Sequence, residues 1–292
     1  MKSNLSKKVF RDYTQAELDR AYDQRQWAPN AAEVIARYGT QSASVRARLD
    51  CIADVAYGES PDEVLDVFPA KTRNAPIHIF VHGGAWHMLS KAESCFQAEP
   101  FVAAGVNFVA LNFANLPRVR LPEMAAQIRR AIGFVFHEAA RFEGDADAIT
   151  ISGHSSGGHL AAVMLTTDWT ELGLPADVVK GGLCASGMYE LEPVLRSARG
   201  SYVKLNVHEA AELSPIRHIG RMLGKASVAW GALESPEFRR QGEEFAAALA
   251  KAGKLETSLV LPKLNHFEVA LDLAAADSAL FRAATRLMGR DA

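Results

Sequence analysis

Residues 150–162 read TISGHSSGGHLAA, in which β-branched residues lead through serines and glycines into small helix formers. This order predicts a strand, a sharp turn and a helix. The turn fits the pattern G-x-S-x-G at Gly153, Ser155 and Gly157. The glycines remove Cβ atoms that would collide in so tight a turn, which holds the serine hydroxyl out of the sheet at a helix N-terminus. We therefore predict that Ser155 is a catalytic nucleophile.

The five-residue motif alone is a weak signal, because a chain of this length contains it by chance roughly one time in ten. The alternative is an ordinary glycine-rich connection between a strand and a helix. The surrounding pattern favours the nucleophile, since strands and helices alternate around the turn. Strands are predicted at 51–58, 63–69, 76–84, 106–114, 147–153, 178–186, 226–231 and 256–262, and helices at 121–142, 156–167, 236–251 and 267–287. Such alternation is typical of an α/β protein with a mainly parallel, doubly wound sheet.

Two segments fall outside this alternation. Residues 14–50 read as helices, and residues 189–223 separate two strands by more than one crossover helix needs. Long insertions in a compact domain are usually functional. We expect a single domain over 1–292, in which these two segments form a helical cap.

Composition limits the classes of partner and location. The chain has 292 residues, 49% of them hydrophobic and 23% charged, with a net charge of −2 and both signs interspersed. This balance argues against a nucleic-acid or membrane partner. The N-terminus lacks the apolar region of a signal peptide, and the three cysteines are widely spaced in apolar settings, which favours a reducing, cytoplasmic location. Whether the chain forms a homo-oligomer is left open.

A second glycine turn lies upstream, in FVHGGAWH at residues 80–87. It follows the third predicted strand, where backbone amides can complete an oxyanion hole for a nucleophile elbow. We predict that the amides of Gly83, Gly84 and Ser156 bind the oxyanion. A plain turn after a strand is the alternative.

The general base and its acid follow by elimination. In this arrangement the chain order is serine, acid, histidine, with the histidine after the final strand. Only His266 among the nine histidines meets that condition, and no aspartate occurs between Asp177 and Asp272. Glu234 comes directly after the strand at 226–231 and is the predicted acid, with Glu237 as the alternative.

The motifs together resemble the α/β-hydrolase type of kynurenine formamidase (arylformamidase) and its bacterial esterase and amidase relatives. The resemblance covers nearly the whole chain and is carried by HGGAW at 82–86, GHSSGGHL at 153–160, SGMYELEP at 186–193, ESPEFRRQ at 234–241 and NHFE at 265–268. It implies an α/β-hydrolase fold with Ser155 as nucleophile and His266 as base. Glu234 stands where the family usually has aspartate, and NFANLP at 112–117 departs from the family's Tyr-x-Leu-x-Pro-like string.

The expected reaction is hydrolysis of an N-formyl or N-acetyl group on an aromatic amine, through an acyl-enzyme, with no cofactor and no metal. N-formylkynurenine, N-formylanthranilate and N-acetylanthranilate are the small-molecule substrates that the resemblance implies. A carboxylesterase for small aryl or short-chain esters would use the same residues, and a non-catalytic ligand-binding protein of the same fold is an alternative from another class. Trp86 and Tyr189 are candidates for substrate binding, with core packing as the alternative for each.

Overall fold

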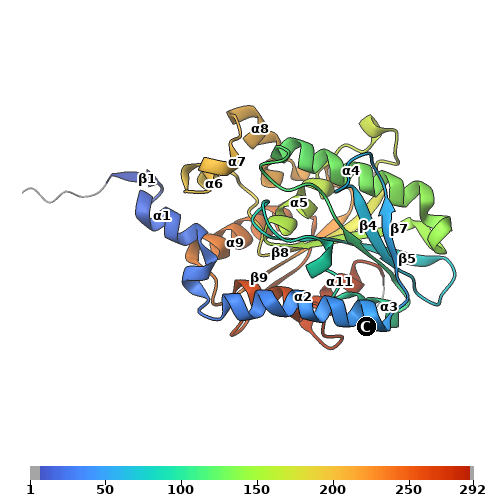
Figure 1. The fold of residues 1–292 in the computed structure, drawn as a ribbon. Helices are drawn as coiled ribbons and strands as arrows, with labels where there is room; N and C mark the ends of the chain where they lie inside the picture. Colours follow the sequence, from blue (N-terminus) through green and yellow to red (C-terminus); the bar gives the residue numbers. More distant parts are fainter. Residues whose placement is uncertain (1–6, 290–292) are drawn as a thin grey trace, which may run out of the picture.

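The computed structural model describes residues 7–289 (Figure 1). Eight strands form one sheet in the order β10-β9-β8-β7-β5-β6-β4-β3. In this order, the strands β10, β9, β8, β7, β5 and β6 pair with one another in parallel. Strand β4 pairs antiparallel with both β6 and β3. The strands are β3 (Ile52–Ala56), β4 (Val64–Phe68), β5 (Ala75–Val81), β6 (Asn107–Leu111), β7 (Gly144–His154), β8 (Val179–Ala185), β9 (Lys225–Gly231) and β10 (Leu255–Leu261). The predicted α/β class with a mainly parallel sheet is confirmed.

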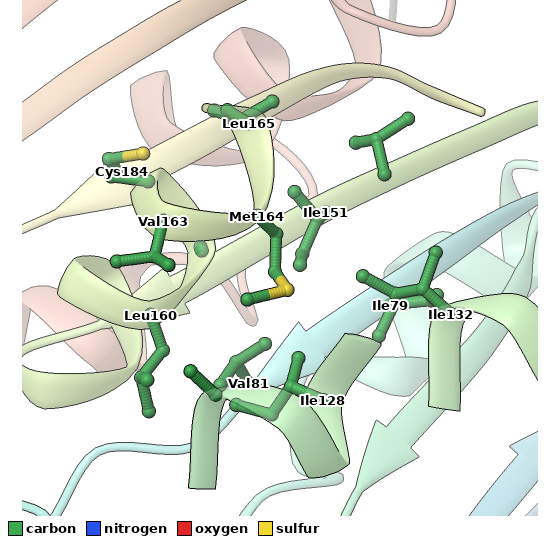
Figure 2. Packing of buried hydrophobic residues seen from close by; sticks show 14 of the residues in the cluster. Ile79, Val81, Ile128, Ile132, Ile151, Leu160, Val163, Met164, Leu165 and Cys184 are labelled. Carbon is green, nitrogen blue, oxygen red and sulfur yellow. The ribbon is translucent and has the colours of Figure 1, made fainter. Parts of the chain in front are cut away.

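Helices cover both faces of the sheet because the central strands carry apolar residues on both sides. Residues such as Ile79 and Ile151 pack under α4 (Leu121–Glu138), α5 (Ser156–Leu165) and α9 (Pro236–Lys251). Figure 2 shows this face, where side chains from β5 and β7 meet those of α4 and α5. Phe80 and Phe108 point to the opposite face, toward α3 (Ala98–Ala103) and α11 (Ala279–Arg286).

The two segments outside the alternation are mostly short helices. The N-terminal segment contains α1 (Gln15–Tyr22), the 3-10 turn η1 (Gln24–Trp27) and α2 (Ala31–Arg48). A capping box begins α1, with Thr14 and Glu17 satisfying each other's backbone N–H groups. The insertion contains α6 (Glu192–Arg196), α7 (Gly200–Val203), α8 (Val207–Glu212) and the 3-10 turns η5 (Pro215–Arg217) and η6 (Ile219–Arg221). Helix α1 packs against α6 and α9.

Two local features differ from the sequence prediction. The single helix expected at 267–287 is two helices, α10 (His266–Asp272) and α11, because the Ser278 hydroxyl accepts from the N–H of Phe281 and starts a new helix. Serine and aspartate favour such caps over helix interiors. A short hairpin of β1 (Lys8–Phe10) and β2 (Tyr13–Thr14) precedes α1 and is not indicated by the sequence pattern.

The remaining short elements are the 3-10 turns η2 (Lys91–Glu93), η3 (Ala139–Phe142) and η4 (Thr170–Leu172). Across residues 7–289, no helix is both long enough and apolar enough to cross a membrane.

Candidate active site

The elbow after β7 has the strained geometry that its sequence predicts. Ser155 is the N-cap residue of α5, with φ 59° and ψ −123°. A positive φ is uncommon for a residue that has a Cβ, and here it turns the chain sharply from strand to helix. A Cβ at Gly153 would collide with the carbonyl of Gly157, and a Cβ at Gly157 would collide with the carbonyl oxygen of Val81. Glycine is therefore needed on both sides of the serine.

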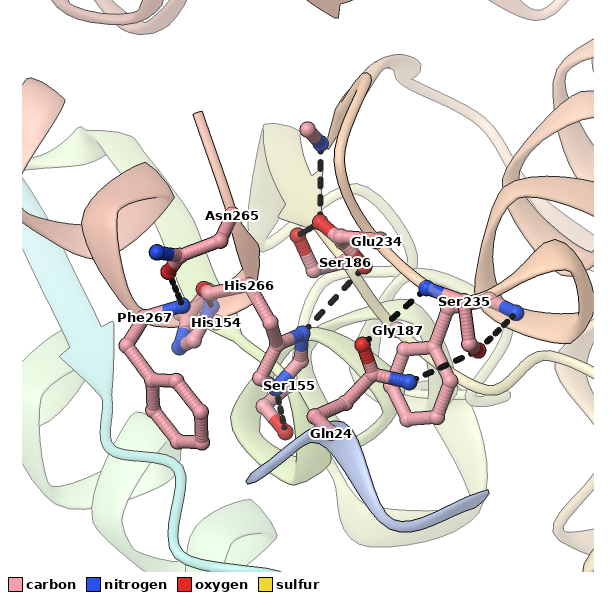
Figure 3. A network of polar contacts seen from close by, with 12 residues as sticks. Gln24, His154, Ser155, Ser186, Gly187, Glu234, Ser235, Asn265, His266 and Phe267 are labelled. Carbon is pink, nitrogen blue, oxygen red and sulfur yellow. Dashed lines mark hydrogen bonds and ion pairs between the residues drawn. The ribbon is translucent and has the colours of Figure 1, made fainter. Parts of the chain in front are cut away.

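Ser155, His266 and Glu234 form a hydrogen-bonded triad, a single row of side chains from serine through histidine to glutamate (Figure 3). Ser155 Oγ lies 2.9 Å from His266 Nε2, and His266 Nδ1 lies 3.2 Å from Glu234 Oε2. His266 is the first residue of α10, and Glu234 lies in the loop between β9 and α9. Their exposed fractions are 6%, 3% and 2% in the order serine, histidine, glutamate, so little water competes for these contacts. The row can move a proton from the serine to the imidazole while the carboxylate orients the ring.

The carboxylate of Glu234 is held by groups beyond the histidine. Its Oε1 atom accepts from the Ser186 hydroxyl at 2.5 Å and from the Gly231 N–H at 2.8 Å. These bonds leave Oε2 facing His266. Sequence reasoning did not find Ser186, although its position directly after β8 places it at the same sheet edge as Glu234. The alternative acid, Glu237, does not contact the histidine: it pairs with Arg240 and accepts from the Tyr22 hydroxyl.

The upstream glycine turn lies against the elbow. A Cβ at Gly83 would sit 3.4 Å from the Cβ of Ser155, and Gly84 has φ +105°. The Ser156 hydroxyl accepts from the N–H of Trp86 at 3.1 Å, which ties the two turns together. Within residues 7–289, the N–H groups of Gly83, Gly84 and Ser156 donate no hydrogen bond to the protein. They are available to a developing oxyanion, as a hole of this kind requires.

His154 is a buried neighbour that sequence reasoning did not assign to the site. Burial and the adjacent His266 ring hold its pKa well below the usual value, so the imidazole stays neutral. Its Nε2 lies 2.7 Å from the backbone carbonyl oxygen of His266, and since a carbonyl only accepts, Nε2 carries the hydrogen. His154 therefore fixes the His266 backbone without placing a repelling charge beside its ring.

A cavity of about 570 Å³ opens above the serine. Ser155, His154 and His266 contribute to its walls, and the other walls come from both segments outside the strand–helix alternation, from the glycine turn between residues 84 and 89, and from Phe267. Its apolar and aromatic walls include Ile35, Tyr38, Met88, Tyr202 and Phe267, and its charged walls include Asp19, Asp23, Arg25 and Arg199. The size and mixed lining suit a small aromatic molecule with polar groups.

The two predicted substrate-binding residues lie in the core instead of the cavity wall. Trp86 is 1% exposed, and its indole N–H donates to Nδ1 of His159. Tyr189 is fully buried, donates to the carbonyl of Cys184 and stacks on Phe245. Each ring satisfies its polar group inside the protein, which turns it away from the cavity. Core packing, the alternative for both, is the arrangement found.

Comparisons with known proteins show the family of the chain. The BD-FAE family model matches residues 65–179. Kynurenine formamidase from Danio rerio is 32% identical, covering 96% of this chain and 99% of that protein. Esterase LipQ from Mycobacterium tuberculosis is 32% identical over 76% of this chain and 58% of its own length. A crystal structure of a putative thioesterase from Silicibacter sp. tm1040 superposes with a TM-score of 0.82 at 27% identity, covering 92% of this chain and 99% of that one. The chain is thus a hydrolase of the α/β-hydrolase superfamily, and it belongs to the kynurenine formamidase family.

Proposed function

We propose that this hydrolase removes an N-acyl group, most simply formyl, from an aromatic amine through an acyl-enzyme intermediate. The observation that carries the proposal is the unbroken row from Glu234 through His266 to Ser155 at the floor of the cavity. N-formylkynurenine, N-formylanthranilate and N-acetylanthranilate are the substrates to test, since the Danio rerio relative that matches over nearly its whole length is a kynurenine formamidase.

In the first half of the reaction, the Oγ atom of Ser155 attacks the acyl carbon while His266 Nε2 takes the hydroxyl proton. The amides of Gly83, Gly84 and Ser156 receive the oxyanion, and loss of one such donor typically costs about 3 kcal/mol of transition-state stabilisation. The C–N bond then breaks, and His266 gives its proton to the departing amine. An aromatic amine leaves more readily than an alkyl amine because its ring delocalises the nitrogen lone pair. Water, activated by His266, hydrolyses the ester and releases the acid.

The cavity supports an aromatic leaving group. Tyr38, Tyr202 and Phe267 line it alongside Ser155, and rings of this kind stack on a flat aromatic substrate. Residues 14–50 and 189–223 both contribute to these walls, and we assign them the role of a cap over a single domain. The unpaired thiols of Cys51, Cys95 and Cys184 support a cytoplasmic location.

A carboxylesterase acting on small aryl or short-chain esters is the second candidate, favoured by the similarity to esterase LipQ. An ester needs the same nucleophile, base and oxyanion donors, so the row of side chains serves both reactions.

The test compares turnover of N-formylkynurenine, the two N-acylanthranilates and p-nitrophenyl acetate. We expect hydrolysis of at least one arylamide, and we expect Ser155→Ala to abolish it while the protein stays folded. Hydrolysis of the ester alone would reject the amidase in favour of the esterase. Failure of a fluorophosphonate to label Ser155 in folded protein would reject both and support the non-catalytic alternative.

A further inference from the structure

The three side chains of the row come from different parts of the sheet. Ser155 lies between the central strand β7 and α5, both of which are buried around it. Glu234 lies instead in the loop that follows β9, and His266 is the first residue of α10, directly after the loop that follows the edge strand β10. Their distance from the serine therefore depends on what holds these two loops in place.

One short segment, residues 22–38, contacts the loop of the acid. The Gln24 side-chain amide donates to the Ser235 hydroxyl at 2.7 Å and accepts from the Ser235 N–H at 3.2 Å. Ser235 directly follows Glu234, and Figure 3 shows the side-chain amide of Gln24 facing it. Gln24 is only 3% exposed, so both hydrogen bonds are shielded from water.

The same segment contacts the loop of the base. Asn30 donates through Nδ2 to Glu268 Oε1 and accepts through Oδ1 from Asn265 Nδ2, each at 2.8 Å. Asn30 is the N-cap residue of α2, yet its side chain makes no capping bond to that helix. Its side-chain amide instead makes hydrogen bonds to Asn265 and Glu268, which lie on either side of His266 in the sequence. Tyr38, on α2, adds a hydroxyl bond to the carbonyl of Phe267 at 2.5 Å.

We propose that Gln24 and Asn30 are positioning residues for catalysis, which set the placement of Glu234 and His266 relative to Ser155 from a single segment. This inference rests on the proposed serine-hydrolase function. Misplacement of a catalytic group by about 1 Å can cost about a hundredfold in rate, so two side-chain amides that act only through their contacts with these loops can control turnover. Neither residue takes part in proton transfer.

A reciprocal swap at Asn30 and Glu268 tests the histidine side. Asn30→Asp alone sets two carboxylates against each other, and Glu268→Gln alone sets two amide NH₂ groups against each other. In the double variant, the new amide at position 268 donates to the new carboxylate at position 30. The side chains at both positions still accept from Asn265, one from its backbone N–H and one from its side chain, so each bond is restored and the total charge is unchanged. We expect each single variant to lose about tenfold in kcat with KM changed less than about twofold, and the double variant to recover most of the loss.

Gln24→Met, which keeps side-chain length but makes neither bond to Ser235, tests the acid side and should lower kcat similarly. Gln26→Ala is the matched control, because Gln26 is exposed and its side chain bonds only to Asp23 within residues 7–289. Rates are divided by the number of sites that a fluorophosphonate titrates, so loss of folded protein does not count as loss of rate.

Unchanged kcat per titrated site in the three single variants, or a double variant no faster than the slower single variant, would overturn the proposal. The rate of Ser155 labelling by the same probe gives a readout that needs no particular substrate. If the wild type is labelled but cleaves no arylamide, the proposed substrate is wrong, while the variants' labelling rates still decide the role of Gln24 and Asn30.

Discussion

At the scale of single residues, Glu234 shows how a carboxylate one methylene longer than aspartate can orient the base. Its Oε1 atom is tied to Ser186 and to the Gly231 N–H, which removes the extra freedom of the longer side chain. Oε2 is then left at hydrogen-bond distance from His266. The additional length is accommodated by contacts within the site, so the geometry allows the role proposed for Glu234.

Glu234→Gln should lower kcat about a thousandfold with little change in KM, because an amide NH₂ facing His266 Nδ1 favours the wrong imidazole tautomer. Steady-state kinetics on the best arylamide or ester provide the measurement. Glu243→Gln makes the same chemical change at an exposed position of α9 and should leave kcat at the wild-type value. A loss below tenfold in Glu234→Gln would show that the carboxylate does not orient the base.

At the scale of elements, what could be predicted depended on how local its determinants are. The geometry of the elbow was predictable because Gly153, Ser155 and Gly157 form one short motif. The position of His266 beside Ser155 was predictable because chain order restricts a candidate base to the region after the final strand. The directions of Trp86 and Tyr189 were not, since they depend on partners in other elements, His159 and Phe245 among them. For the same reason, the contacts of residues 22–38 with the catalytic loops could not be read from the sequence.

Asp66 on β4 links several of these elements. It is fully buried and accepts from Lys91 at the start of η2, from Arg46 on α2 and from the Asp54 N–H. Burial opposes its ionisation, but hydrogen bonds from Lys91, the Asp54 backbone and Arg46 outweigh that effect and hold its pKa below the usual value. Asp66 thereby fastens α2, which carries Asn30 at its N-cap, to the sheet.

Asp66→Asn should lower the free energy of unfolding by about 3 kcal/mol, because it leaves partly buried cations without their carboxylate. The carboxylate's stabilisation is fully present above the unfolded-state pKa of about 4 and is lost as pH falls through the lower folded-state pKa. Urea unfolding at neutral pH measures the loss. The control is Asp54→Asn, since the Asp54 side chain also pairs with Lys91 but is 74% exposed and should contribute less than about 1 kcal/mol. Equal losses in the two variants would contradict the assignment.

At the scale of the whole molecule, the interior holds several uncharged histidines. Burial lowers the pKa of His78 to about 3 and the pKa values of His82 and His159 to about 4, and it holds the pKa of His154 well below its usual value. His78 is a residue of β5, and its ring nitrogens bond to the hydroxyls of Thr150 and Ser152 on the neighbouring strand β7. In the unfolded chain each of these histidines would titrate near a pKa of about 6.5.

These histidines should make the fold labile to mild acid. Between about pH 6.5 and pH 4 these histidines bind protons in the unfolded chain but not in the folded chain. The free energy of unfolding therefore falls as pH falls, by up to about 1.4 kcal/mol per pH unit for each histidine. Urea unfolding at pH 7, 6 and 5 should show this dependence. His78→Gln should lower the number of protons taken up on unfolding, and hence the slope of stability against pH, by the contribution of about one histidine. His208→Gln, at an exposed position, should leave it unchanged. An identical pH dependence in wild type and His78→Gln would contradict this account.

The contacts of residues 22–38 also order events during synthesis. Gln24 and Asn30 emerge early, but Ser235 and Glu268, their partners, follow by 211 and 238 residues. Contacts between such distant positions form only once the intervening chain is available to fold. A nascent chain that has reached β8 already holds the proposed nucleophile and oxyanion turn, yet it lacks the proposed acid and base. On the proposed mechanism, the growing polypeptide cannot hydrolyse a substrate until its C-terminal strands join the sheet, and residues 22–38, although made early, make these contacts late.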